Sequence, residues 1–177
     1  FPNSGKSTLV AAVSRAHPRI AAYPFTTLRP CLGTVEDDGY RKITVADIPG
    51  LVEGSHQNVG LGHAFLRHIE RSRVLLMVVD MAGVDGRYPW EDYRQLRREL
   101  KLHNPELIEK EFLVAANKMD LSPAEGNLKE FQSRLRLNPS RILPISAQEK
   151  TALDRLRAAL FRIVPETEFA ETADEAD

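Results

Sequence analysis

The amino-acid sequence predicts an α/β fold in which a mostly parallel sheet is flanked by helices. Short apolar runs alternate along the chain with segments whose apolar residues recur at helical spacing, which is typical of this class. Two of these runs, Val74–Val79 and Phe112–Ala116, are apolar without alternation and therefore suit strands that are buried on both faces. The turn residues Asp38 and Gly39 lie between two further runs and predict one antiparallel hairpin in the sheet.

The first half of the chain is predicted to contain helices, the hairpin and two long loops. Apolar residues at helical spacing predict a helix over residues 6–16, which we expect to end before Pro18. Residues 20–30 show no periodicity and are expected to form a loop. The other elements predicted here are the hairpin strands at 32–36 and 43–48, a glycine-rich loop at 49–62 and a helix at 63–72.

The second half continues the alternation of strands and helices. The strand at 74–79 is followed by a helix whose apolar stripe contains Trp90 and Tyr93, two side chains that we expect in the core. Pro144 cannot donate a backbone hydrogen bond, so a strand at 142–145 is expected at the edge of the sheet. The remaining predicted elements are a strand at 112–116, a helix at 124–137 and a closing amphipathic helix through Leu153, Leu156, Leu160 and Ile163.

The composition indicates a soluble globular protein. Hydrophobic residues make up 42% and charged residues 28% of the 177 positions, and the longest apolar run, Val74–Val79, is too short to cross a membrane. With no leader and a single cysteine, Cys31, we expect a cytoplasmic protein without a membrane partner. The net charge of −1 argues against a protein that coats nucleic acid. Residues 165–177 hold six acidic and no basic side chains, so we expect one domain over 1–164 and an acidic tail or linker over 165–177.

The chain begins with a sequence that is typical of a phosphate-binding loop. Phe1–Thr8 reads FPNSGKST, which matches G-x-x-x-x-G-K-[ST] without its first glycine. Gly5 lets backbone N–H groups surround a phosphate, Lys6 brings a positive charge to the β and γ oxygens, and Ser7 offers a hydroxyl to Mg²⁺. The expected phosphate-binding segment also includes Asn3, Ser4 and Thr8. The strand that enters such a loop is missing, so we expect a fragment of a longer chain whose sheet lacks this inner strand.

A second motif follows the second hairpin strand, where Asp47 and Gly50 have the spacing D-x-x-G. A carboxylate at the end of a buried strand can hold Mg²⁺ through water, so Asp47 is a candidate metal residue beside Ser7. The N–H of Gly50 is placed to reach a γ-phosphate. The same spacing occurs in ordinary turns, and its position after a strand is what favours the phosphate interpretation.

A third and a fourth motif predict a guanine site. Asn117-Lys118-Met119-Asp120 follows directly on the strand at 112–116, and the carboxylate of Asp120 can accept two hydrogen bonds from guanine. Adenine has no matching donors, so we expect GTP to be preferred over ATP. Ser146-Ala147 follows the edge strand and is expected to offer a backbone N–H to the guanine oxygen. All four motifs follow strand ends in one consistent order, which predicts a ligand in the crevice outside those ends.

Together these motifs resemble the G domain of the Obg (CgtA) GTPases, which are Ras-like P-loop NTPases, across nearly the whole chain. The most specific matches are Tyr23–Leu28 (YPFTTL), Ala46–Gly54 (ADIPGLVEG) with Gly60–Gly62, and Phe65–Arg71 (FLRHIER). The resemblance implies that Thr27 joins Ser7 and Asp47 on Mg²⁺ and that Phe25 and Thr26 line the nucleotide. The residues that it assigns to the base are Asn117, Lys118, Asp120, Ser146 and Ala147.

The resemblance also implies an activity and a partner. It implies a GTPase that engages the RNA and proteins of the large ribosomal subunit during assembly, with Lys6, Thr27 and Gly50 as its catalytic residues. We expect a monomer.

The residue after the D-x-x-G motif makes slow hydrolysis the expectation. Leu51 stands where Ras-like enzymes place a glutamine that orients the attacking water, so hydrolysis should be slow or assisted by a partner. Asn3 is a candidate for holding K⁺ beside the phosphates, as in similar GTPases with asparagine at this position. Two alternatives stay open: a metabolic P-loop kinase or ATPase, against which the N-K-M-D motif counts, and a nucleotide-binding protein with negligible turnover, which Leu51 permits.

Overall fold

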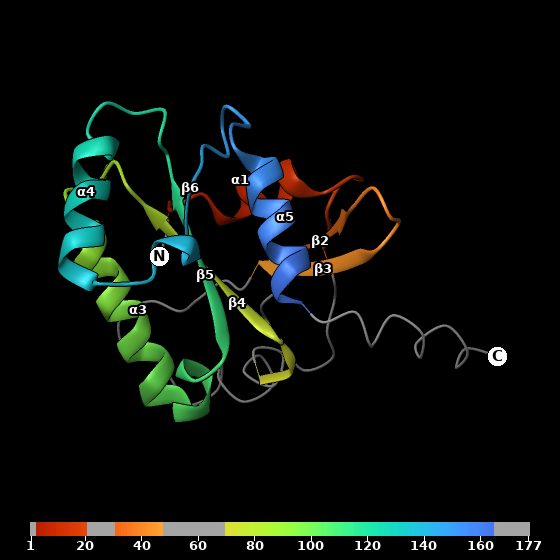
Figure 1. The fold of residues 1–177 in the computed structure, drawn as a ribbon, viewed down its shortest axis with the longest axis horizontal. Helices are drawn as coiled ribbons and strands as arrows, with labels where there is room; N and C mark the ends of the chain where they lie inside the picture. Colours follow the sequence, from red (N-terminus) through yellow and green to blue (C-terminus); the bar gives the residue numbers. More distant parts are fainter. Residues whose placement is uncertain (1–2, 21–30, 48–69, 165–177) are drawn as a thin grey trace.

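The computed structural model describes residues 3–20, 31–47 and 70–164 of the chain (Figure 1). The helices in these ranges are α1 (Lys6–Val13), α3 (Pro89–His103), α4 (Ala124–Leu135) and α5 (Leu153–Ile163). The strands are β1 (Arg19–Ile20), β2 (Cys31–Glu36), β3 (Lys42–Asp47), β4 (Val74–Asp80), β5 (Glu111–Asn117) and β6 (Ile142–Pro144). Short 3-10 helices at Pro105–Ile108 and Pro139–Arg141 precede β5 and β6. The predicted α/β class is confirmed.

The second half of the chain forms a parallel sheet of three strands in the order β4-β5-β6. Its register places Asp80 beside Asn117 and Ala116 beside Pro144. β6 lies at the edge of this sheet, as Pro144 predicts, since an edge strand needs to donate hydrogen bonds on one side only.

A second sheet, in the order β1-β2-β3, is antiparallel and contains the predicted hairpin. The carboxylate of Asp37 closes the turn, because its Oδ1 accepts hydrogen bonds of 2.9 Å from the N–H groups of Gly39 and Arg41. β1 was not predicted: Arg19 and Ile20 pair with Leu32 and Cys31, and two residues are too few to show a period. In the described residues no strand joins the two sheets.

Helix α1 is shorter than predicted and ends at Val13 rather than at residue 16. Ser14 has extended backbone angles, and its hydroxyl and N–H both donate to the carbonyl of Val10. The N–H of Arg15 then donates to the carbonyl of Thr34 in β2. The chain therefore leaves the helix early because strand β2 supplies the next hydrogen bond.

Both faces of the parallel sheet are covered, as the apolar strands predict. On one face Met77 and Val79 belong to a core with α3 and α4, in which Trp90 is 6% and Tyr93 5% exposed, so their predicted burial is confirmed. On the other face Val78 and Leu113 pack in a second core with α1, α5 and the hairpin. Figure 1 shows the pair α3 and α4 on one side of the sheet and the pair α1 and α5 on the other.

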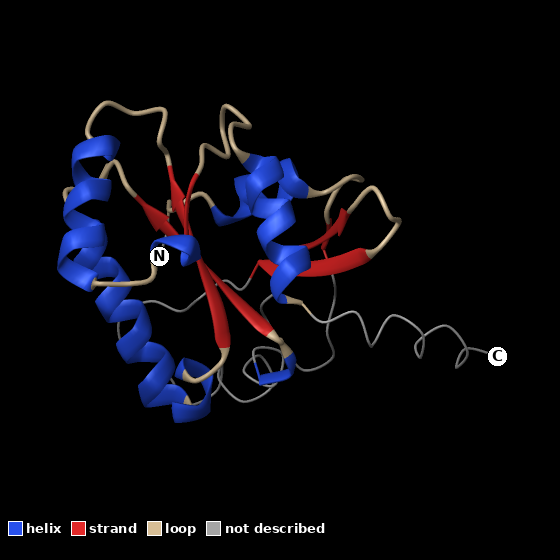
Figure 2. Ribbon diagram, in the orientation of Figure 1, coloured by secondary structure: helices blue, strands red, loops and turns tan. Residues whose placement is uncertain are grey.

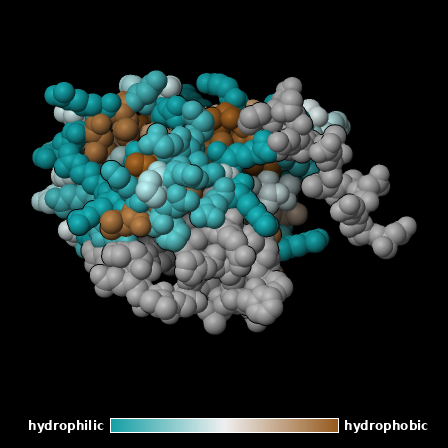
Figure 3. Space-filling model, turned by 90° about the horizontal axis from the view of Figure 1, so that it is seen from below, coloured by the Kyte–Doolittle hydropathy of each residue, from teal (hydrophilic) through white to brown (hydrophobic). Residues whose placement is uncertain are grey.

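The surface of the described part is mainly hydrophilic. Figure 3 shows apolar residues as small separate patches among polar ones on the face in view. Among the described residues no helix combines the length and hydropathy that a membrane span requires.

Candidate nucleotide site

The four motifs lie where elements begin or end around the parallel sheet. β4 and β5 run in parallel, so their carboxyl ends lie at the same end of the sheet (Figure 2). Asp80 and Asn117 are the last residues of these two strands. Asp47 ends β3, and Gly5 immediately precedes α1. The contacts described next join these ends into one site.

The phosphate loop requires a glycine at position 5 for two reasons. Gly5 has a φ of +89°, in the left-handed region that other residues rarely adopt. A Cβ at this position would lie 2.4 Å from Nδ2 of Asn117, which is closer than real contacts allow. Helix α1 begins directly after it without a side-chain cap, so the first turn offers backbone N–H groups to an anion.

The side chains of the phosphate loop differ in exposure. Lys6 is half-buried, Ser7 and Thr8 are exposed, and Ser4 is only 2% exposed. Asn3 is exposed and has a φ of +59°, so its side chain is accessible beside the loop.

Ser7 and Asp47 come together across the two motifs. The hydroxyl of Ser7 donates a hydrogen bond of 2.6 Å to Oδ2 of Asp47. Asp47 is 8% exposed, and its Oδ1 is buried without a hydrogen-bond partner in the part of the chain that the structure describes. A buried carboxylate oxygen without a partner is unfavourable unless something neutralises it. A hydroxyl and a carboxylate with one unsatisfied oxygen are hard oxygen ligands that suit Mg²⁺, so these residues fit that ion.

Asn117 ties the phosphate loop to the loop that contains Ala147. Its Nδ2 donates to the carbonyl of Ser4 at 2.9 Å, and its Oδ1 accepts from the N–H of Ala147 at 2.9 Å. All three residues are at most 3% exposed. Asn117 therefore satisfies two buried backbone groups on segments far apart in sequence, and it fixes their relative position.

The geometry after β6 differs from one expectation. The N–H of Ala147 donates to Asn117, and the N–H of Ser146 donates to the carbonyl of Thr151 at 3.3 Å. Neither N–H is free for a guanine oxygen in this structure, because the turn and Asn117 use both. The hydroxyl of Ser146 accepts from the N–H of Glu149 at 3.0 Å, which holds the turn in place.

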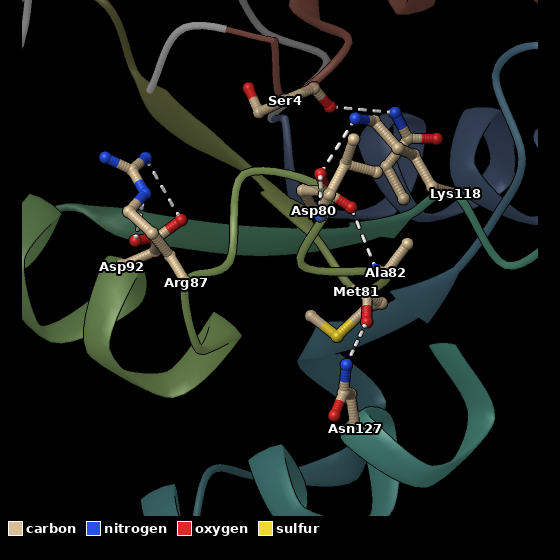
Figure 4. Close-up of polar contacts among 10 residues, drawn as sticks. Ser4, Asp80, Met81, Ala82, Arg87, Asp92, Lys118 and Asn127 are labelled. Atoms are coloured by element: carbon tan, nitrogen blue, oxygen red, sulfur yellow. Dashed lines mark hydrogen bonds and ion pairs between the residues drawn. The ribbon is translucent and has the colours of Figure 1, made fainter. Parts of the chain in front are cut away.

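The carboxylate of Asp120 is available to a ligand. Asp120 is exposed and makes no hydrogen bond or ion pair with any residue in the described ranges. It lies three positions after the buried Asn117, within the loop between β5 and α4. Lys118, between them, has a φ of +65° and forms an ion pair of 2.8 Å with Asp80 (Figure 4).

Asp80 is the residue of this site that the sequence analysis missed. Its position at the end of a buried strand is the same signal that identified Asp47, so the sequence contained it. Other predicted site residues, namely Phe25, Thr26, Thr27 and Gly50, lie outside the described residues, as does Leu51. Their roles stay predictions, and so does the tail at 165–177.

Comparisons with known proteins give a consistent result. Residues 1–118 match the family described as 50S ribosome-binding GTPase. The chain is 52% identical to GTPase Obg of Akkermansia muciniphila over 164 residues, covering 93% of this chain and 46% of that protein. It is 49% identical to GTPase Obg of Bacillus cereus over 180 residues, covering 100% of this chain and 42% of that protein. The chain thus spans less than half the length of these curated relatives.

Solved structures have the same fold. Era of Aquifex aeolicus, bound to GDP and aluminium fluoride, is 28% identical with a TM-score of 0.66, covering 94% of this chain and 55% of that one. The G domain of the FeoB iron transporter of T. maritima is 18% identical with a TM-score of 0.62, covering 92% of each chain. At 18% identity the second likeness concerns the fold alone.

Proposed function

Because the chain belongs to the family of 50S ribosome-binding GTPases and is an Obg-type G domain, we propose that it is a GTP-operated switch. It binds GTP, hydrolyses it to GDP and phosphate, and acts in assembly of the large ribosomal subunit in the cytoplasm. The metabolic kinase or ATPase is not favoured, since the relatives are GTPases.

The double hydrogen bond of Asn117 is the observation that carries this proposal. It brings the phosphate loop and the base loops to one edge of the sheet, so a single ligand can reach both. A nucleotide has a phosphate chain at one end and a base at the other. This matches a site with the basic Lys6 in the phosphate loop and the acidic Asp120 in the loop after β5. Lys6 faces the phosphates in this arrangement, and Asp120 selects the base.

The base is guanine because the exposed carboxylate of Asp120 accepts two hydrogen bonds from that purine. Adenine would leave the carboxylate without its donors, and a desolvated charged acceptor without partners costs about 1–3 kcal/mol or more. Lys118, Ser146 and Ala147 frame this end of the site.

At the phosphate end, Ser7 and Asp47 would hold Mg²⁺ together with Thr27, and the ion would neutralise charge on the β and γ oxygens. Lys6 and the N–H groups of the first turn of α1 bind the same oxygens. Gly50 senses the γ-phosphate through its N–H. Leu51 cannot orient water, so turnover is slow until a partner assists.

A monovalent ion is the remaining candidate at this end. The exposed side chain of Asn3 lies beside the phosphate loop, where a K⁺ held by its oxygen would offset charge that develops during hydrolysis. The ribosome is the partner proposed for the switch: a monomer whose loops are ordered by GTP binds the large subunit, and hydrolysis releases it.

The test is GTP hydrolysis by the full-length protein with and without large ribosomal subunits. We expect slow basal turnover that the subunits change, and binding to subunits that is stronger with GTP than with GDP. Asp120→Asn should shift preference from guanine toward xanthine nucleotides in competition binding, because an amide donates where the carboxylate accepts. Unaltered GTP affinity in that variant contradicts the base assignment, and indifference to the subunits contradicts the ribosomal role.

A further inference from the structure

Asp80 is a buried carboxylate that the proposed function does not use. It ends β4, its residue is 9% exposed, and it lies beside Asn117 in the register of the parallel sheet. Among the described residues, its carboxylate accepts from the N–H of Ala82 at 2.8 Å, the N–H of Val84 at 3.4 Å and Nζ of Lys118 at 2.8 Å (Figure 4). A charge this deep is costly unless it is paired, and Lys118 supplies the pair.

The ion pair also determines where the Lys118 side chain lies. Its side chain is 21% exposed, whereas a lysine near the surface usually extends its ammonium group into water. Figure 4 shows the side chain of Lys118 directed toward Asp80, on the side where Ser4 also lies. The backbone of Lys118 is left-handed, with a φ of +65°.

Lys118 is followed two residues later by the base-selecting carboxylate of Asp120. In this loop the N–H of Met119 donates to the carbonyl of Ile145, the Met119 side chain packs against the core with α3 and α4, and the N–H of Leu121 donates to the carbonyl of Lys118. The side chain of Asp120 has no partner among the residues described. The ion pair adds to these contacts and ties the start of the loop that presents Asp120 to the end of β4.

We propose that Asp80 is a positioning residue for guanine recognition, which acts by holding Lys118 and thereby the loop that carries Asp120. The inference rests on the proposed function and adds a residue to it. Asp80 lies at the base end of the site, so its effect falls on nucleotide affinity and not on the hydrolytic step. GTP and GDP are affected alike, because they share the base.

The alternative is that Asp80 only stabilises the loop after β4, through the N–H groups of Ala82 and Val84. Asp80→Asn separates the two roles. The asparagine keeps an oxygen that can accept from Ala82, but it has no charge for Lys118. Asp92→Asn is the matched control, because Asp92 is also a buried carboxylate, 8% exposed, but pairs with Arg87 rather than with Lys118.

The experiment uses the full-length protein and fluorescent GDP and GTP. The wild type is measured first, and a wild type that binds neither nucleotide contradicts the proposed function itself. For Asp80→Asn we expect Kd to rise about 10- to 100-fold for both nucleotides, the range for a hydrogen bond to a charged group, with faster dissociation. KM for GTP should rise while kcat at saturating GTP stays within about twofold.

The control and a double variant decide the mechanism. Asp92→Asn should leave both Kd values within about twofold, because Asp92 pairs with Arg87 and not with Lys118. In a Lys118→Met background, Asp80→Asn should have no further effect on affinity, because its target is gone. This comparison also serves if Asp80→Asn alone does not fold, since the double variant leaves neither charge unpaired. The proposal is overturned by unchanged affinity in Asp80→Asn, by an equal loss in Asp92→Asn, or by additive effects in the double variant.

Discussion

The close approach of Gly5 to Asn117 gives the sharpest prediction of the structure. Gly5→Ala places a Cβ 2.4 Å from Nδ2 of Asn117 and forces a residue other than glycine to adopt a φ of +89°. The backbone term costs about 1–2 kcal/mol. Asn117 must also move, and losing its bond to the buried carbonyl of Ser4 costs about 1–3 kcal/mol more. The total of about 2–5 kcal/mol is a large part of a domain stability of about 5–15 kcal/mol.

Two other glycines separate these terms. Gly86 has a φ of +73°, but no atom lies within 4 Å of the position that a methyl group would take, so Gly86→Ala should cost the backbone term of about 1–2 kcal/mol alone. Gly126 lies in α4 with a helical backbone and open space, so Gly126→Ala should stabilise by about 0.5–1 kcal/mol.

Urea unfolding of the nucleotide-free protein measures all three variants. The expected order of stability is Gly126→Ala above the wild type, then Gly86→Ala, then Gly5→Ala. Nucleotide affinity should fall in Gly5→Ala alone, since only this change displaces Asn117. If Gly5→Ala is no less stable than Gly86→Ala and binds GTP normally, the contact between Gly5 and Asn117 does not support the site, and the reasoning is refuted.

Three further measurements test other parts of the molecule. Ser7→Ala removes the hydroxyl beside Asp47, so Mg²⁺-dependent GTP turnover should fall roughly 10-fold or more in a Mg²⁺ titration, and a normal titration would remove Ser7 from the metal site. Turnover should be faster in K⁺ than in Na⁺ if Asn3 holds the monovalent ion, and equal rates end that idea. Burial raises the pKa of Asp92 above its ordinary value of 3.8, so the stability that it contributes is full below that pH and is lost as pH rises through the folded pKa. Urea unfolding between about pH 4 and pH 7 should therefore show the wild type losing stability relative to Asp92→Asn, and parallel pH curves would contradict the burial argument.

Much of the fold followed from local patterns in the sequence. The apolar runs at 74–79 and 112–116 predicted strands that are buried on both faces, and Pro144 predicted the edge strand, because each depends only on the chemistry of neighbouring residues. The two-residue strand β1 and the early end of α1 depend instead on hydrogen bonds to β2, a segment distant in sequence. Such long-range hydrogen bonds produce no periodic pattern of apolar residues in the sequence.

The same distinction applies to the site. The phosphate loop and the N-K-M-D segment were recognisable as motifs because their spacing is fixed within a few residues. The position of Asp80 at a strand end was readable from the sequence, but its ion pair with Lys118 depends on the register between β4 and β5, which no spacing along the chain reports. The pairing of the Ala147 N–H with Asn117 was missed for the same reason, since it joins loops after two different strands.

The bridging position of Asn117 has a consequence for how the protein is made. Ser4 and Asn117 are 113 positions apart, and Ala147 lies 30 positions further on. Because a nascent chain emerges from its N-terminus, the phosphate loop leaves the ribosome before Asn117 and lacks this support until most of the domain has been translated. A translation product that is halted before Ala147 lacks one of the two backbone groups that hold Asn117. Its phosphate loop is then not held in the shape that binds GTP. The domain is therefore expected to bind a nucleotide only after synthesis has passed Ala147.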